Sequence, residues 1–169
     1  MAKRSVLKPN KSFRENARLL LPVLLDDFLS RKDRIVGHPR LKNDFHKMRL
    51  AGKTLRYAME VFQAAFGDEF SGCLDDVKQL LDVMGQVTDC DVNVPVLRLH
   101  LREMRSFNRV TASQHDAIRT KALTDLIHIQ QTRRTELFNE ACASIERLGA
   151  EDFRQRLIRS MSAVSATKE

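Results

Sequence analysis

Apolar positions along this chain recur every three or four residues, which is the spacing of one buried face of an α-helix. Residues 17–28 and 48–66 are two such stretches. No segment alternates apolar and polar residues as a half-buried strand does, and only six glycines and four prolines interrupt the pattern. The sequence therefore predicts an all-α protein, an up-and-down bundle of about five to six helices.

The ends of these helices are predicted from capping and helix-breaking residues. Ser12 is the expected N-cap of the first helix, and Gly67 is expected to end the second. Pro95 is expected to begin the fourth helix, and Thr111 or Ser113 to cap the fifth. The predicted ranges are 12–36, 41–66, 71–91, 95–107, 114–148 and 151–162.

The length of 169 residues suits one domain with its own core. We expect residues 1–11 to be a disordered basic arm, 12–163 to be the helical domain and 164–169 a flexible tail. The start of the chain lacks the apolar stretch of a signal peptide, and the apolar run at 19–25 is too short to span a bilayer. These features predict a cytoplasmic protein with no membrane partner.

The cysteine pattern agrees with that location. Cys73, Cys90 and Cys142 contain no C-x-x-C pair, and each stands beside apolar residues. We therefore expect reduced thiols in the core and no metal site.

The positive charge of the chain is concentrated in two regions. The net charge is +7 and the isoelectric point is about 9.7. Residues 1–62 contain 15 basic and 6 acidic side chains, and residues 92–134 contain 8 and 3. Residues 63–91, by contrast, contain 1 basic and 7 acidic side chains. An anionic partner is therefore expected, with a binding site that draws on both basic regions.

The second predicted helix places its cations on one side. At 100° per residue, five basic side chains fall within an arc of about 80°, beside an apolar face around Met48 and Leu55. A solvated basic face would explain this arrangement equally well on geometry alone. These five residues, called the basic stripe below, are Lys42, His46, Arg49, Lys53 and Arg56.

Three further cations fall on apolar faces of other helices. Arg31 and Arg134 lie within the apolar seams of the first and fifth helices, and Lys78 lies toward the core side of the third. A guanidinium in such a seam is costly unless it is paired or reaches water or a ligand. Pairing with acids such as Asp27 or Asp89 is one explanation, and convergence with the basic stripe on a phosphate-rich ligand is the other.

Two motifs resemble the CHAD family, the conserved histidine α-helical domain. Residues 44–62, DFHKMRLAGKTLRYAMEVF, contain the pattern H-x-x-R-x-x-x-K-x-L-R-Y. Residues 74–92, LDDVKQLLDVMGQVTDCDV, contain the Leu/Gly segment that ends in Asp-x-Asp-Val, and the similarity extends over residues 17–162. The resemblance implies bundled helices around a basic groove that binds inorganic polyphosphate, with a role at polyphosphate granules or in phosphate metabolism.

The resemblance also implies which cations bind the ligand, and together with the stripe it gives the predicted site. The predicted polyphosphate-binding residues are His46, Arg49, Lys53, Arg56, Lys42, Lys78, Arg31 and Arg134. Gly52, Thr54 and Thr88 depart from residues common in the family. The family's full domain contains two such repeats and this chain resembles one, so we expect a homodimer that rebuilds the two-repeat domain.

Three other functions are weighed against polyphosphate binding. Arg98, Arg102, Arg105 and Arg109 form a second basic row that fits a nucleic-acid backbone or a solvated face, but no exposed aromatic platform for bases is apparent. Catalysis is not expected, because no Gly-rich phosphate loop, nucleophile–base pair or paired carboxylates for Mg²⁺ are found, and no cofactor is implied. A helical scaffold without an anionic ligand is the remaining alternative.

Overall fold

The computed structural model describes residues 7–111 and 118–162. Within these residues every regular element is helical, so the prediction of an all-α helical bundle is confirmed. The elements are α1 (Phe13–Leu29), α2 (Lys32–Ile35), α3 (Lys42–Phe62), the 3₁₀-helix η1 (Gln63–Ala65), α4 (Asp68–Val110), α5 (Lys121–Leu148) and α6 (Glu151–Ser162).

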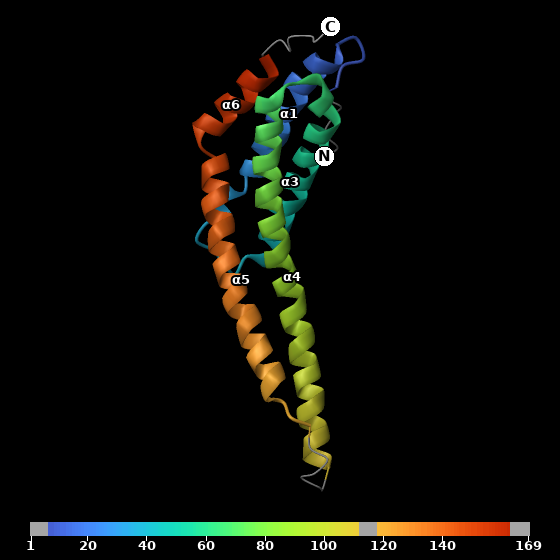
Figure 1. The fold of residues 1–169 in the computed structure, drawn as a ribbon, viewed down its shortest axis with the longest axis vertical. Helices are drawn as coiled ribbons and strands as arrows, with labels where there is room; N and C mark the ends of the chain where they lie inside the picture. The colour runs from blue at the N-terminus through green and yellow to red at the C-terminus, as the bar shows by residue number, and fades with distance from the viewer. Residues whose placement is uncertain (1–6, 112–117, 163–169) are drawn as a thin grey trace.

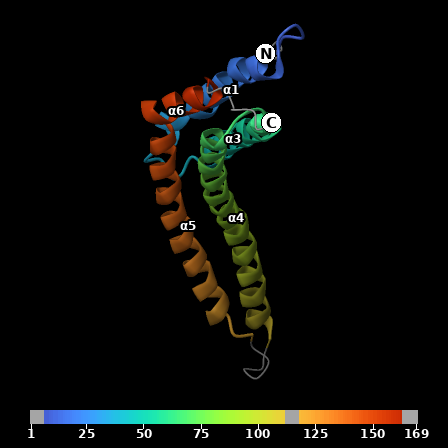
Figure 2. The same ribbon diagram turned by 45° about the horizontal axis from the view of Figure 1, so that its top comes forward.

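The helices form a packed head and a long two-helix arm (Figures 1 and 2). In the head, α3 packs on α1 and α4, and α6 packs on α1 and α4. The arm consists of residues 92–110 of α4 and 121–134 of α5, which lie side by side in both views. The main core cluster of buried side chains takes its members from the head and, in the described part of the chain, none from residues 92–134.

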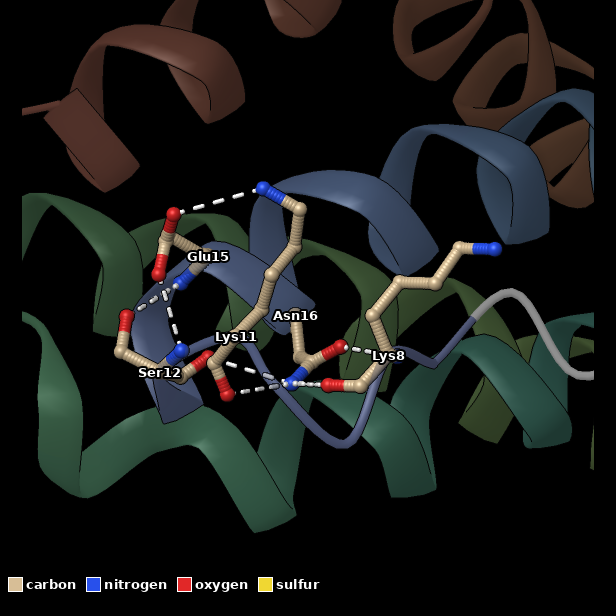
Figure 3. Close-up of polar contacts among 5 residues, drawn as sticks. All are labelled: Lys8, Lys11, Ser12, Glu15 and Asn16. Atoms are coloured by element: carbon tan, nitrogen blue, oxygen red, sulfur yellow. Dashed lines mark hydrogen bonds and ion pairs between the residues drawn. The ribbon is translucent and has the colours of Figure 1, made fainter.

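Helix α1 begins with the cap that the sequence predicts (Figure 3). The Glu15 backbone N–H donates to Ser12 Oγ at 3.3 Å, and the Ser12 backbone N–H donates to Glu15 Oε2 at 2.8 Å. This reciprocal pair, a capping box, satisfies backbone groups that have no partner inside the helix. Of the predicted N-terminal arm, residues 1–6 lie outside the described residues, and Lys8 bonds to the Asn16 side chain at 2.7 Å.

Helix α3 lies close to both of its neighbours because Gly52 has no side chain. A Cβ atom at Gly52 would lie 2.7 Å from Leu81 Cδ2 of α4 and 3.0 Å from Phe28 Cε2 of α1. All three residues are buried. This contact allows α3 to pack closely against both α1 and α4.

The prediction of a helix break before Pro95 is wrong, because α4 runs continuously from Asp68 to Val110 with Pro95 inside it. Proline removes one backbone hydrogen bond, but α4 packs against α5, and the two helices lie side by side along the arm (Figures 1 and 2). Tertiary packing therefore overrides a local breaker.

Two other predicted boundaries also differ. The first predicted helix is divided, because α1 ends at Leu29 and α2 begins at Lys32. The Ser30 hydroxyl donates to the Asp27 carbonyl at 2.7 Å, which stabilises this break. Thr111 follows the end of α4 rather than capping α5, Ser113 lies outside the described residues, and α5 begins at Lys121.

The three cysteines are buried and form no disulfide. Burial raises the pKa of the Cys73, Cys90 and Cys142 thiols, so their neutral form is favoured. No helix among the described residues is both long enough and apolar enough to cross a membrane.

Candidate anion-binding site

Helices α3 and α4 run antiparallel in a regular register. Lys42 Nζ lies 2.5 Å from Asp91 Oδ1, Arg49 lies against Gly85, and Gly52 lies against Leu81. Along these contacts the residue number rises on α3 as it falls on α4, at about one or two helical turns per step. The register places the basic stripe of α3 along the edge of the contact between the two helices.

The side chains of the basic stripe become less exposed to solvent from the start of α3 toward its end. Lys42 and His46 are exposed, whereas Arg49, Lys53 and Arg56 are half-buried. In the described part of the chain, His46, Arg49 and Lys53 form no ion pair with a carboxylate. The stripe therefore concentrates positive charge at the edge of the α3–α4 contact, with little compensation from the protein.

Arg49 and Arg56 each bury a guanidinium N–H that lacks an acceptor. The Nε atoms of both side chains are inaccessible to solvent and make no hydrogen bond. Arg56 Nε lies 3.6 Å from Glu60 Oε1, which is close enough for an ion pair and too long for a hydrogen bond. A buried donor left without an acceptor costs about 1–3 kcal/mol.

The position of Arg49 depends on a glycine in the facing helix. A Cβ atom at Gly85 would lie 3.3 Å from Arg49 Nη2 and 3.8 Å from Arg49 Nε. The guanidinium therefore occupies the space that any other side chain at position 85 would fill. The two residues belong to the two sequence motifs, but only the fold shows that they touch.

Tyr57 positions the other two half-buried cations. Its ring centroid lies 4.7 Å from Arg56 Cζ and 5.8 Å from Lys53 Nζ, distances at which cation–π attraction operates. The tyrosine side chain is exposed. It therefore holds two cations near the surface without neutralising either.

The register of the two helices predicts that Lys78 of α4 lies near the basic stripe. It is seven residues before Gly85, and Arg56 is seven residues after Arg49, so both shifts are close to two helical turns. In the antiparallel register, Lys78 therefore faces the Arg56 end of the stripe. Its Nζ lies 3.7 Å from Asp75 Oδ1, a contact between two solvent-accessible side chains.

Arg134 and Lys42 are joined elsewhere, by Asp91. Arg134 Nε lies 3.1 Å and Lys42 Nζ 2.5 Å from Asp91 Oδ1. Arg134 also donates to the Pro39 carbonyl at 2.8 Å, and its Cζ lies 5.2 Å from the centroid of the Phe138 ring. The acid that pairs with the arginine in the α5 seam is thus Asp91, not Asp89.

Arg31 is likewise engaged within its own segment. Its Nη1 donates to the Asp27 carbonyl at 3.0 Å, one helical turn earlier. This contact stabilises the end of α1, and no hydrogen bond or ion pair among the described residues joins Arg31 to the stripe. The predicted site is therefore divided. Arg49, Lys53 and Arg56 lie along the edge of the α3–α4 contact, Lys42 of the stripe meets Arg134 at Asp91, and Arg31 bonds to the end of α1.

A pocket of about 480 Å³ opens beside Asp91, between α4, α5 and the segment that precedes α3. Arg40, Lys42, Arg98 and Arg134 line it, together with Asp91. Sequence reasoning did not assign Arg40 to a site, because Arg40 precedes α3 and belongs to no periodic face. It assigned Arg98 only to the arginine row of the arm.

Donors outnumber acceptors throughout these surfaces. Among the described residues, no three His, Cys, Asp or Glu side chains gather as a metal site would require. Clustered Arg and Lys side chains suit phosphate oxygens, which accept from guanidinium pairs and from ammonium groups. The chemistry that the arrangement supports is the binding of a polyanion.

Comparison with known proteins gives one match. The family model of the CHAD domain matches residues 3–98, which is more than half of the chain. The matched segment includes the basic stripe, Lys78 and Arg31, and it ends before α5 and Arg134. No curated protein and no solved structure matches the chain significantly.

Proposed function

Because this chain belongs to the CHAD domain family, we propose that it binds inorganic polyphosphate through the basic stripe and does not catalyse a reaction on it. The observation that supports this most directly is the half-buried pair Arg49 and Arg56. Each buries a guanidinium N–H without an acceptor. They lie on one face of α3 with Lys53 between them.

A phosphate chain along the edge of the α3–α4 contact would relieve the repulsion between the cations of the empty site. Cations three or four residues apart on a helix repel each other by a few tenths of a kcal/mol each. Phosphate oxygens would accept from the arginine Nη groups and neutralise this charge. The proposed contacts are with Arg49, Lys53 and Arg56, with His46 and Lys78 beside them.

The test replaces Arg49, Lys53 and Arg56 together by Ala and measures long-chain polyphosphate binding by titration calorimetry. We expect affinity to fall at least about a hundredfold, since three charge-assisted contacts are lost. Circular dichroism should show unchanged helicity. The matched control replaces Arg102, Arg105 and Arg109, which removes the same charge from the exposed arm and should weaken binding much less.

Two results would contradict the proposal. Equal losses in the two triple variants would mean that affinity follows net charge alone. A competition assay gives the second result. If RNA and long polyphosphate displace each other equally well, the nucleic-acid function is favoured instead. Binding should in either case weaken steeply with salt, because phosphate contacts release counterions.

The proposed functional unit is a homodimer that rebuilds the two-repeat domain. An exposed apolar row on the arm supports this association. Gly85, which α3 covers in the head, is seven residues or about two helical turns before Val92. The apolar row therefore continues the face of α4 that packs against α3. The row spans about 80° of α4. Its members are Val92, Val96, Leu99, Phe107 and Val110.

Light scattering with size exclusion tests the dimer. We expect a dimer at micromolar concentration and its dissociation by Leu99→Glu, which places a charge in the apolar row. A wild-type monomer, with or without polyphosphate, would refute the association. The cellular location that follows from the proposed ligand is cytoplasmic, at polyphosphate granules.

A further inference from the structure

The pocket beside Asp91 joins segments that are far apart in the chain. Arg134 of α5 contacts Asp91 of α4 across 43 positions and the Pro39 carbonyl across 95 positions. The pocket is therefore a product of the fold, at the place where the arm leaves the head. It lies apart from Arg49, Lys53 and Arg56, which do not line it.

The charges around this pocket are unbalanced. Four cationic side chains line it, and Asp91 is the single carboxylate among the lining residues. That carboxylate already pairs with both Lys42 and Arg134. Arg40 and Arg98 are exposed, and neither has a carboxylate partner among the residues that the structure describes.

Arg134 is held as a preorganised donor. Its side chain is only 13 % exposed, and Asp91, Pro39 and the Phe138 ring fix the guanidinium. These hydrogen bonds use Nε and Nη2, and none among the described residues uses Nη1. A fixed guanidinium with a free N–H loses little entropy when it binds an anion.

We propose that this pocket is a second anion site, which shares only Lys42 with the basic stripe and binds a compact phosphate anion of the size of pyrophosphate. Arg40 and Arg98 supply the uncompensated charge, and Arg134 Nη1 supplies an oriented donor. The volume of about 480 Å³ accommodates such an anion with its bridging water. The proposal goes beyond polyphosphate binding by the stripe and does not require it.

Asp91 has a definite role in this site. Its carboxylate holds Arg134 in place but also competes with an incoming anion for Lys42 and Arg134. Its replacement by Asn removes the negative charge and keeps an oxygen acceptor of the same shape. Asp91→Asn should therefore strengthen anion binding, which a purely structural carboxylate would not do.

The experiment titrates pyrophosphate into the full chain at low salt by calorimetry. Against the wild type, we expect Arg40→Ala with Arg98→Ala to weaken binding about tenfold or more, because two cations of the site are lost. Both side chains are exposed, so the fold should persist. Asp91→Asn should bind about tenfold more tightly, and the Arg49, Lys53, Arg56 triple variant should lose less affinity for pyrophosphate than the Arg40, Arg98 variant.

The outcomes separate this site from the stripe. Pyrophosphate binding that is lost in the stripe variant and kept in the Arg40, Arg98 variant would overturn the second site while leaving the proposed function intact. Absence of wild-type binding at millimolar pyrophosphate would also overturn it. If neither variant loses affinity for long-chain polyphosphate, the proposed role of the stripe is refuted. The proposal for the pocket would then still be decided by the pyrophosphate titrations.

Discussion

Arg49 of α3 and Gly85 of α4 touch in such a way that the glycine makes room for the guanidinium. A Cβ atom at position 85 would lie 3.3 Å from Arg49 Nη2. The two residues belong to different sequence motifs, and their contact brings those motifs together. The proposed ligand site depends on this contact.

Gly85→Ala should reduce polyphosphate affinity severalfold without a change in charge, because the new methyl group displaces the Arg49 guanidinium. Thermal unfolding should not show destabilisation, since Ala favours helix over Gly by about 1 kcal/mol. Calorimetry of both proteins with the same polyphosphate measures the effect. Gly72→Ala is the matched control, because it is the same change on α4 with open space around the Cβ, and unchanged affinity in both variants would refute the role of the Arg49–Gly85 contact.

Gly52→Ala should destabilise the protein by about 1–2 kcal/mol. Its Cβ would lie 2.7 Å from Leu81 Cδ2 and 3.0 Å from Phe28 Cε2, both buried, so overpacking outweighs the gain in helix propensity. Urea unfolding followed by circular dichroism measures the change. Gly72→Ala should by contrast stabilise slightly, and equal effects of the two substitutions would contradict the tight contact at Gly52.

Arg134→Ala should lower the free energy of unfolding by about 1–3 kcal/mol. It removes the partner of Asp91, a carboxylate whose side chain is only 14 % exposed, and it leaves the Pro39 carbonyl without its donor. Lys42 still neutralises Asp91, which limits the loss. The neighbouring Arg133→Ala removes an exposed side chain and should change stability by less than about 0.5 kcal/mol. If Arg133→Ala and Arg134→Ala destabilise the protein equally, the contacts of Arg134 with Asp91 and Pro39 are not the cause.

The capping box predicts a pH dependence for the start of α1. Hydrogen bonds from the Ser12 backbone and side chain lower the pKa of Glu15 below its ordinary value of 4.5. A lowered folded pKa means that the stabilisation is present above about pH 4.5 and is lost as pH falls through the folded value. The free energies of unfolding of wild type and Glu15→Gln should therefore differ at pH 7 and converge as pH falls through the folded pKa. Glu136→Gln, which removes an exposed carboxylate of α5, should change stability little at pH 7.

The same cap predicts the cost of losing the hydroxyl. Ser12→Ala should lower the free energy of unfolding by about 1 kcal/mol, because the Glu15 backbone N–H loses its acceptor. Ser12→Asn, which can still accept, should recover most of the loss. If Ser12→Asn is as unstable as Ser12→Ala, the hydroxyl does not act as a cap.

The buried thiols should react slowly while the protein is folded. Burial raises the pKa of Cys73, Cys90 and Cys142 above the ordinary value of 9.0, and the thiolate is the reactive form. Iodoacetamide at pH 8 followed by mass spectrometry should label them slowly in buffer and fully in urea. Because the unfolded thiols ionise first, stability should fall as pH rises above about 9. Fast labelling of the folded protein would contradict their burial.

Local features of the chain were sufficient to predict much of this protein. The all-α class, the N-cap Ser12 and the family were confirmed, because helix periodicity, capping and the motif are properties of neighbouring residues. The basic stripe was also predictable as a surface, since residues on one helix share a face whatever packs against it. Its role in binding stays a prediction.

The features that the sequence did not predict depend on contacts between segments that are far apart in the chain. Whether Pro95 breaks α4 depends on the packing of α5, and whether Arg134 joins the stripe depends on where Asp91 lies when α4 and α5 meet. Neither follows from the spacing of residues on one helix, because the register between two helices is set by side chains such as Gly52 and Gly85 that permit close approach. The fold therefore places one group of cations along the edge of the α3–α4 contact and another around Asp91, although the periodicity of the chain does not distinguish the two groups.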